Sequence, residues 1–136
     1  MDIYSQLERD EGFRPFPYRD SVGILTVGIG RNLENVGVSK EEALFLLQND
    51  VAKAIAGLRQ ALPWFDWLTV RRQAVLVNMA FNMGVAGVLE FRHMLDNLEK
   101  GDYEKSAAEM LDSLWSSQVG QRAARLAQQM RSDQWV

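Results

Sequence analysis

The chain has 136 residues, of which 47% are hydrophobic and 24% charged, and its formal net charge is −3. This length and composition favour a single globular domain. With no cysteine and one histidine, the sequence argues against a disulfide framework, thiol catalysis and a multi-histidine metal site, and we expect no cofactor. The acidic charge balance argues against a nucleic-acid-binding protein.

The first predicted element is a short helix over residues 2–11. Ile3, Leu7 and Glu11 are spaced four residues apart and therefore share one face of that helix. If this face packs on a core, Glu11 lies at the edge of apolar packing, where burial favours the protonated form of a carboxyl group. A protonated Glu can donate its proton to a leaving oxygen. Gly12 predicts that the helix ends directly after Glu11.

A tight turn and a strand are predicted next. Asp20 and Gly23 occupy the first and fourth positions of a four-residue segment, which is typical of a type I turn. Residues 24–29 are rich in strand formers, and their alternation places Thr26 and Gly28 on one face. Because Gly28 has no side chain, a ligand could approach its backbone closely. Asp20 and Thr26 could together hold a water molecule.

Glu11, Asp20 and Thr26 follow one another at a Glu-x8-Asp-x5-Thr spacing. A proton donor, a second carboxylate and a hydroxyl group that holds water are the requirements of glycoside hydrolysis with inversion. Taken singly, each residue has a structural interpretation, because helix-ending Glu, turn Asp and strand Thr are common at protein surfaces. Only their combination favours a catalytic interpretation.

The rest of the chain predicts helices. Ser39 and Glu42 form a capping box, and apolar residues at three- and four-residue spacing predict one long amphipathic helix over about 39–62. Residues 70–83 are apolar on nearly all sides in their second half, which indicates a buried helix. Further helices are expected at about 91–100, 103–113 and 121–130. The four tryptophans are more typical of packing than of sugar stacking: Trp64, Trp67, Trp115 and Trp135.

Three segments resemble the phage-type (T4-like) lysozymes, glycoside hydrolase family 24. They are Glu11–Gly30 with its Thr-Val-Gly-Ile-Gly ending, Asn78–Gly84 and Gln121–Arg125. They occur in the family's order and together span most of the chain. The resemblance implies an α+β, mostly helical, two-lobed fold within one domain of residues 1–136. Its parts are a small β-hairpin lobe at about 13–38, a linking helix at about 39–62, and a helical lobe at about 63–136 that includes the first helix, 2–11.

The resemblance also implies an endo-acting muramidase. Such enzymes hydrolyse the β-1,4 bond between N-acetylmuramic acid and N-acetylglucosamine in peptidoglycan. Glu11 is then the general acid, Asp20 assists the attacking water or stabilises the developing positive charge, and Thr26 positions the water on the opposite ring face. The outcome implied for the reaction is inversion.

Supporting and glycan-binding residues are implied in the same way. Arg122 pairs with Glu11, and Arg125 pairs with Asp10, so that the first helix is tied to the carboxy-terminal half. The side chains and backbone expected to bind substrate are Asn32, Phe81, Asn82, Gly28 and Gly30.

Three features depart from the family. Arg31 stands where the best-known member has His, and Met94 and Glu109 stand where polar glycan contacts are expected. The loop before the long helix is also short. We therefore expect a small lobe reduced to little more than a hairpin.

We expect a monomer whose partner is the glycan strand of peptidoglycan, without nucleic-acid binding or stable membrane insertion. The amino terminus lacks the basic leader and apolar core of a signal peptide, and no run of about 18 apolar residues predicts a membrane span. The expectation is a phage or prophage endolysin, made in the cytoplasm and released to the cell wall by a separate holin. A domain of a larger protein is the other origin considered, and a non-catalytic glycan-binding or structural module of lysozyme fold is the alternative function.

Overall fold

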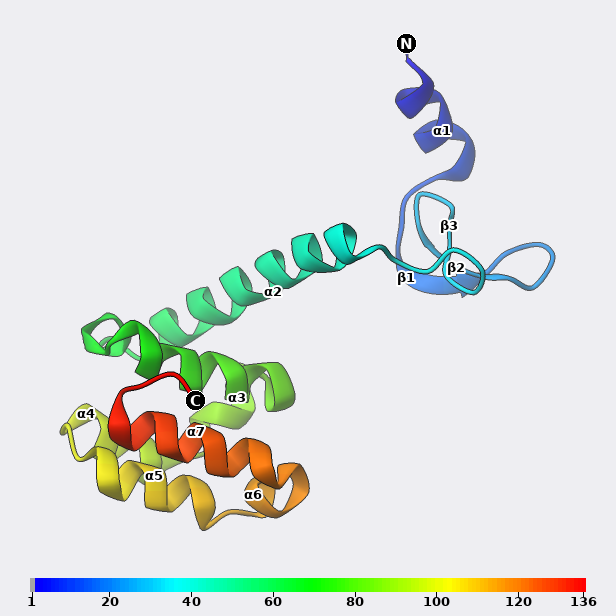
Figure 1. The fold of residues 1–136 in the computed structure, drawn as a ribbon. Coiled ribbons are helices and arrows are strands. Elements are labelled where there is room, and N and C mark those ends of the chain that lie inside the picture. Colours follow the sequence, from blue (N-terminus) through cyan, green and yellow to red (C-terminus); the bar gives the residue numbers. More distant parts are fainter. Residues whose placement is uncertain (1) are drawn as a thin grey trace. The chain divides into compact units, whose positions relative to one another are not determined.

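The structure, a computed structural model, describes residues 2–136 and divides into two compact units, Met1–Leu47 and Gln48–Val136. The long helix α2 (Lys40–Ala61) begins in the first unit and continues into the second (Figure 1). The predicted fold class, α+β and mostly helical, is confirmed. The predicted division into lobes, with the first helix joined to the helical lobe, concerns how the parts sit together and stays a prediction.

The first unit holds a short helix and a small antiparallel sheet. Its elements before α2 are α1 (Ile3–Glu11), β1 (Arg14–Arg19), β2 (Leu25–Gly28) and β3 (Arg31–Asn32). The strand order is β1-β2-β3, and Thr26 of the central strand faces Tyr18 on one side and Asn32 on the other. Pro15 and Pro17 fit β1 because an edge strand tolerates residues that lack a backbone donor.

Helix α1 is bounded by two specific caps. The Asp2 side chain accepts a hydrogen bond from the Ser5 backbone N–H at 2.8 Å, which lowers the pKa of Asp2. At the other end Gly12 adopts a φ of +73° and its N–H donates to the Glu8 carbonyl at 2.8 Å. The predicted helix end after Glu11 is therefore confirmed, and it fixes where the Glu11 side chain leaves the helix.

The start of α2 is the predicted capping box. The Ser39 N–H donates to Glu42 Oε1 at 2.9 Å, and the Glu42 N–H donates to Ser39 Oγ at 3.1 Å. The apolar stripe becomes buried along the helix, from Leu44 at 45% exposure to Leu58 at 0%. The second half of α2 therefore belongs to the core of the second unit.

The second unit is helical and has a continuous hydrophobic core. Its further elements are η1 (Phe65–Trp67), α3 (Val70–Leu89), α4 (Arg92–Glu99), α5 (Tyr103–Leu111), α6 (Leu114–Val119) and α7 (Gln121–Ser132). Val75, Leu76 and Met79 of α3 are fully buried, which confirms the predicted core helix. No single helix in residues 2–136 has the length and apolar character to cross a membrane; α3 and α4 meet both criteria only as a pair, bent by 93°.

Three helix boundaries differ from the sequence-based prediction. Helix α3 runs to Leu89 across Gly84, whose φ of +77° interrupts the helical geometry. Helix α5 ends at Leu111 because Ser113 accepts a hydrogen bond from the Ser116 N–H and so begins α6, a helix that was not predicted. Helix α7 extends to Ser132.

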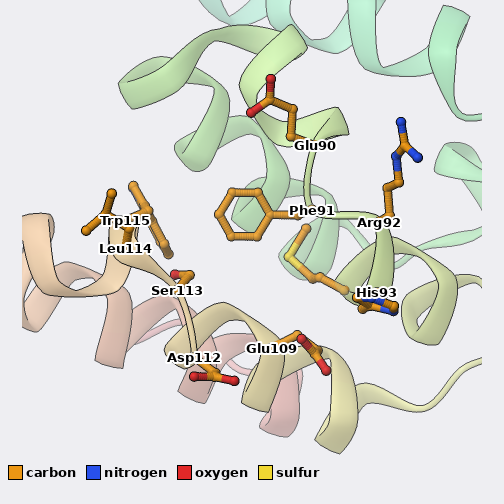
Figure 2. A pocket seen from close by; sticks show the side chains of 10 residues that line it. Glu90, Phe91, Arg92, His93, Glu109, Asp112, Ser113, Leu114 and Trp115 are labelled. Atoms are coloured by element: carbon orange, nitrogen blue, oxygen red, sulfur yellow. The ribbon is translucent and has the colours of Figure 1, made fainter.

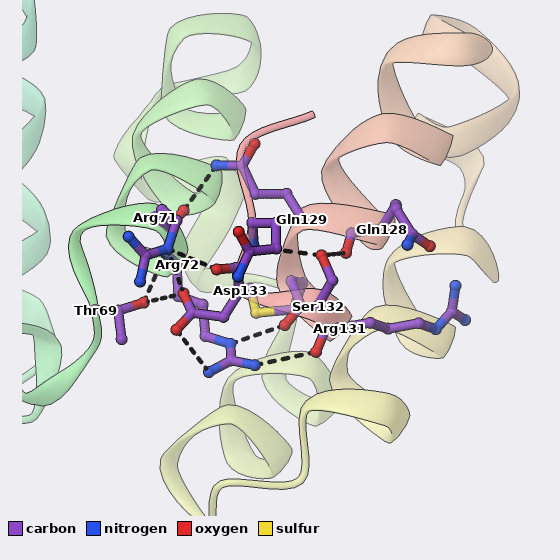
Figure 3. A network of polar contacts seen from close by, with 10 residues as sticks. Thr69, Arg71, Arg72, Gln128, Gln129, Arg131, Ser132 and Asp133 are labelled. Carbon is purple, nitrogen blue, oxygen red and sulfur yellow. Dashed lines mark hydrogen bonds and ion pairs between the residues drawn. The ribbon is translucent and has the colours of Figure 1, made fainter.

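A polar network fastens the end of α7 to the start of α3 (Figure 3). The buried Arg72 guanidinium donates to the Met130 carbonyl at 2.8 Å and to the Arg131 carbonyl at 3.1 Å. Asp133, at a φ of +55°, accepts from Thr69 Oγ1 at 2.5 Å, and this bond is the main cause of its lowered pKa. The carbonyls left free at the end of a helix thus acquire partners from another helix.

Candidate active site

Glu11 is the last residue of α1, and its side chain is exposed within the first unit. The carboxyl group lies against the backbone of Gly30, in the connection between β2 and β3. A methyl group placed on Gly30 would lie 2.9 Å from both Cδ and Oε2 of Glu11. Helix α1 has no buried residue in the structure, so the expected packing of its Ile3 and Leu7 face on a core stays a prediction.

Asp20 is fixed by the turn that it begins. Its Oδ1 accepts hydrogen bonds from the backbone N–H groups of Val22 and Ile24, both at 2.9 Å. The Gly23 N–H donates to the Asp20 carbonyl at 3.0 Å, which confirms the predicted turn. These bonds use one carboxylate oxygen, and Oδ2 is not part of them.

Thr26 lies in the central strand and is only 5% exposed. Its hydroxyl donates to the Ile24 carbonyl at 2.9 Å. Because the hydroxyl hydrogen is committed to this bond, the oxygen lone pairs remain available to accept a hydrogen bond from water or substrate. The orientation of this hydroxyl group is therefore set by the strand itself.

The backbone of Ile24 joins Asp20 to Thr26. Its N–H donates to Asp20 Oδ1, and its carbonyl accepts both from the Asp20 N–H at 2.9 Å and from Thr26 Oγ1. A carboxylate and a hydroxyl six residues apart in sequence are thus held by one residue. Ile24 was not predicted to have this role, because main-chain groups carry no residue-specific signal.

Two acidic residues, Glu34 and Glu42, hold the loop around the sheet, and the sequence analysis predicted neither to do so. Glu34 Oε1 accepts from Arg19 at 2.7 Å and from the Leu25 N–H at 3.0 Å. The predicted capping residue Glu42 also pairs with Arg31, and the hydrogen bond from Arg31 is the main cause that lowers the pKa of Glu42 to about 2. The same bond raises the pKa of Arg31. Arg31, one of the positions that depart from the family, thus has Glu42 as its ion-pair partner.

The other predicted glycan contacts of the first unit are backbone or loop positions. Gly28 has a φ of +69° and no atom within 4 Å of where a side chain would begin, so its surroundings are open. Asn32 is half-buried opposite Thr26, and its Oδ1 accepts from the Asn35 N–H at 2.9 Å. Asn32 therefore also shapes the loop that follows β3.

Phe81 and Asn82 lie in the second unit, on α3. Phe81 is 43% exposed and lines a cavity of about 220 Å³ with Asp50, Lys53 and Ala54 of α2. Asn82 is exposed, and its Oδ1 accepts from the indole N–H of Trp115 at 2.9 Å. Trp64 and Trp115 are buried, as packing residues would be, whereas Trp67 and Trp135 are exposed.

The predicted supporting residues have the following local contacts. Arg122 on α7 donates to Asn78 Oδ1 at 2.8 Å and to the Asn78 carbonyl at 3.1 Å. Arg125 is exposed on the same helix, and Asp10 accepts from Arg9 at 2.9 Å. The expected pairs, Arg122 with Glu11 and Arg125 with Asp10, would join the two units and stay predictions.

A larger cavity of about 360 Å³ opens among α4, α5 and α6 in the second unit (Figure 2). Phe91 and Trp115 meet edge to face in its wall, with ring centroids 6.1 Å apart. The cavity also includes Met94 and Glu109, the two positions predicted to depart from the family's polar contacts. The exposed side chain of the only histidine, His93, lines it as well.

Comparison with known proteins shows the family of this chain. The family model described as phage lysozyme matches residues 8–133. The chain is 33% identical to the pre-baseplate central spike protein Gp5 of Enterobacteria phage T4, over 93% of this chain but 27% of that protein. It is 30% and 25% identical to the probable T4-type lysozymes 1 and 2 of Dictyostelium discoideum, over 91% of this chain and 90% of each of them. The chain therefore belongs to the phage lysozyme family.

Proposed function

We propose that the chain is a muramidase that hydrolyses the β-1,4 bond between N-acetylmuramic acid and N-acetylglucosamine in peptidoglycan. Its main support is the coupling of Asp20 and Thr26 through Ile24, in a unit where Glu11 ends the neighbouring helix. Membership of the phage lysozyme family gives independent support. A carboxyl acid, a second carboxylate and an oriented hydroxyl are the groups that an inverting glycosidase needs.

Each of the three residues has a proposed step. Glu11 protonates the leaving oxygen of the glycosidic bond as general acid. Asp20, anchored through Oδ1, uses Oδ2 to activate the attacking water or to stabilise the positive charge that develops on the sugar. Thr26 accepts a hydrogen bond from that water and holds it on the face of the ring opposite the leaving group. This assignment predicts inversion.

Glycan binding is proposed at positions around these groups. The open backbone at Gly28 allows a sugar to approach the strand, and Asn32 offers a polar side chain beside it. In the second unit, the exposed ring of Phe81 and the amide of Asn82 supply an apolar surface and a polar group of the kind that sugars bind. Their contribution to the same glycan is part of the proposal.

The biological setting is a further part of the proposal. We propose a phage or prophage endolysin, monomeric and released to peptidoglycan by a holin. The two Dictyostelium relatives named as lysozymes, whose length the chain nearly spans, support only a lysozyme that is not part of a larger protein. The chain spans about a quarter of the T4 spike protein. That match supports the second origin, a lysozyme domain within a larger phage protein.

The test is the release of reducing ends from purified peptidoglycan, with mass spectrometry of the fragments. Wild type should release fragments that end in reducing N-acetylmuramic acid, whereas Glu11→Gln should reduce turnover by roughly 100-fold or more, because the amide cannot donate the proton. Glu8→Gln is the matched control, since Glu8 is an exposed glutamate one turn earlier on α1.

Other products would identify other functions. Anhydro ends would show a lytic transglycosylase, and near-wild-type turnover of Glu11→Gln would refute the role of Glu11. A folded wild-type protein that gives no product on several wall types would favour the non-catalytic module. NMR of the first product distinguishes the stereochemistry, because inversion of a β-linkage yields the α-anomer first.

A further inference from the structure

Gly28 and Gly30 have the same backbone conformation but different surroundings. Both have a φ of +69°, a region that favours glycine. No atom lies within 4 Å of where a side chain would begin at Gly28, whereas at Gly30 the Glu11 side chain fills that space, with Cγ at 3.0 Å and Cδ and Oε2 at 2.9 Å. The positive φ alone therefore explains why residue 28 is glycine. At residue 30 there is a second reason, because the Glu11 side chain occupies the space that another side chain would need.

The Glu11 carboxylate is otherwise loosely held within its unit. The side chain is exposed, and among residues 2–47 the structure records no hydrogen bond or ion pair to this carboxylate. Its position in this unit is therefore determined by the end of α1 and by the surface against which it lies. That surface is the bare backbone of Gly30.

We infer that Gly30 is a positioning residue for Glu11: the missing side chain leaves a space, here called the Glu11 seat, in which the carboxyl group lies. The existence of the Glu11 seat is inferred from the contacts described above. Only its expected effect on turnover depends on the proposed function. It gives Gly30 a role distinct from the direct glycan contact expected from the sequence.

Substitution by alanine should affect the two glycines in different ways. At both positions the positive φ strains the new residue, so thermal stability should fall by similar amounts, roughly 2–4 °C. At Gly30 the methyl group would also overlap the end of a flexible, exposed side chain, which can rotate away. The consequence is a displaced carboxyl group and not an unfolded protein.

Displacement of a general acid by about 1 Å can lower turnover on the order of 100-fold. For Gly30→Ala we expect a loss of kcat of this order with KM nearly unchanged, because the groups proposed to bind glycan keep their places. In a Glu11→Gln background the same substitution should have no further effect on the residual rate, since residues that act as a unit are non-additive.

The closing experiment records the side-chain NMR resonances of Glu11, carboxyl carbon included, in wild type, Gly30→Ala and Gly28→Ala. We expect a clear shift in Gly30→Ala and little change in Gly28→Ala. Equal changes in both variants, or none in a folded Gly30→Ala, would overturn the seat. If Gly30→Ala unfolds, the Glu11→Asp background should restore folding, because the side chain is shorter by one methylene; failure to do so would also overturn it.

The NMR measurement does not depend on activity. A wild-type protein without product release would refute the proposed function, yet the resonances would still show whether the seat exists. An active enzyme whose Glu11 resonances are indifferent to Gly30→Ala would refute the seat alone.

Discussion

The two units of the molecule are stabilised by different kinds of interaction. Among residues 2–47, only Thr26 is buried, and the sheet and its loops are held by hydrogen bonds at Asp20, Ile24 and Glu34. In residues 48–136 the buried hydrophobic residues form one cluster that extends from Leu58 to Met130. The first unit thus relies on directional polar contacts and the second on apolar packing.

Polar residues therefore have different roles in the two units. In the second unit, buried polar groups support packing: Ser106 donates to the Met94 carbonyl at 3.0 Å, and Arg72 caps the end of α7. In the first unit, Asp20 and Thr26 shape the chain and are also the proposed catalytic groups. A substitution there can change structure and chemistry together, so pairs of variants are needed to separate the two effects.

The largest expected loss of stability comes from Arg72→Met in the second unit. This change removes two hydrogen bonds to carbonyl groups and the stacking of the guanidinium on Tyr103, 3.4 Å from the ring centroid. We expect the free energy of unfolding to fall by about 2–4 kcal/mol, measured by chemical denaturation. The side chain of methionine keeps most of the buried volume, so the loss reports the polar contacts.

Arg92→Met is the control for Arg72→Met. Arg92 is exposed at the start of α4, and its replacement should change the free energy of unfolding by less than about 0.5 kcal/mol. Equal effects of the two substitutions would show that the link between α3 and α7 does not stabilise the helical unit.

A smaller loss, confined to the first unit, is expected from Asp20→Ala. This variant leaves the Val22 and Ile24 N–H groups without their shared acceptor, at a cost of about 1–2 kcal/mol, whereas Asp20→Asn keeps an oxygen in the same place. Hydrogen exchange of these two amides should therefore accelerate about 5- to 30-fold in Asp20→Ala. It should change little in Asp20→Asn.

Turnover should respond differently to the same two variants. Both remove the negative charge proposed to act at the sugar, so both should lose on the order of 100-fold in kcat. If Asp20→Asn kept wild-type turnover, the role of Asp20 would be the turn alone. If it accelerated exchange as much as Asp20→Ala, the hydrogen-bonding role would be wrong.

Local sequence patterns correctly predicted the features that are determined by a few neighbouring residues. Gly12 ends α1, Ser39 and Glu42 begin α2, and the Asp20 turn forms as its residue types indicate. Each of these features is decided within four residues by backbone conformation or a reciprocal hydrogen bond. These features can therefore be predicted from the spacing of residue types in the sequence.

Features that depend on contacts between distant residues, or on main-chain groups, could not be predicted from local sequence patterns. Helix α6 begins because Ser113 turns to cap it, although Ser113 also fits the end of the preceding helix. Ile24 contributes only backbone atoms to the link between Asp20 and Thr26, and the contact of Gly30 with Glu11 joins positions 19 residues apart in the numbering. Residue types alone do not distinguish Gly30 from Gly28, because both satisfy the same φ.

The smallest expected effect, and the one that best tests whether charge orders the first unit, is that of Glu42→Gln. The remaining oxygen of glutamine can still complete the capping box with Ser39, so the variant removes the charge and the acceptor oxygen that face Arg31. The pKa of Glu42 is about 2 in the structure and 4.5 ordinarily, so its ionised form stabilises the folded chain above pH 4.5. This stabilisation should be lost as the pH falls from 4.5 through 2.

Thermal unfolding of wild type and Glu42→Gln across this pH range measures the effect. Wild type should have the higher Tm at neutral pH, and the difference should shrink steadily below pH 4.5, because protonation then makes the two side chains equally neutral. Glu41→Gln is the matched control, with the same charge lost from the same turn of α2 and no ion pair recorded in residues 2–136. A difference for Glu42→Gln that persists unchanged at pH 2 would mean that shape, and not the charge pair with Arg31, joins the sheet to α2.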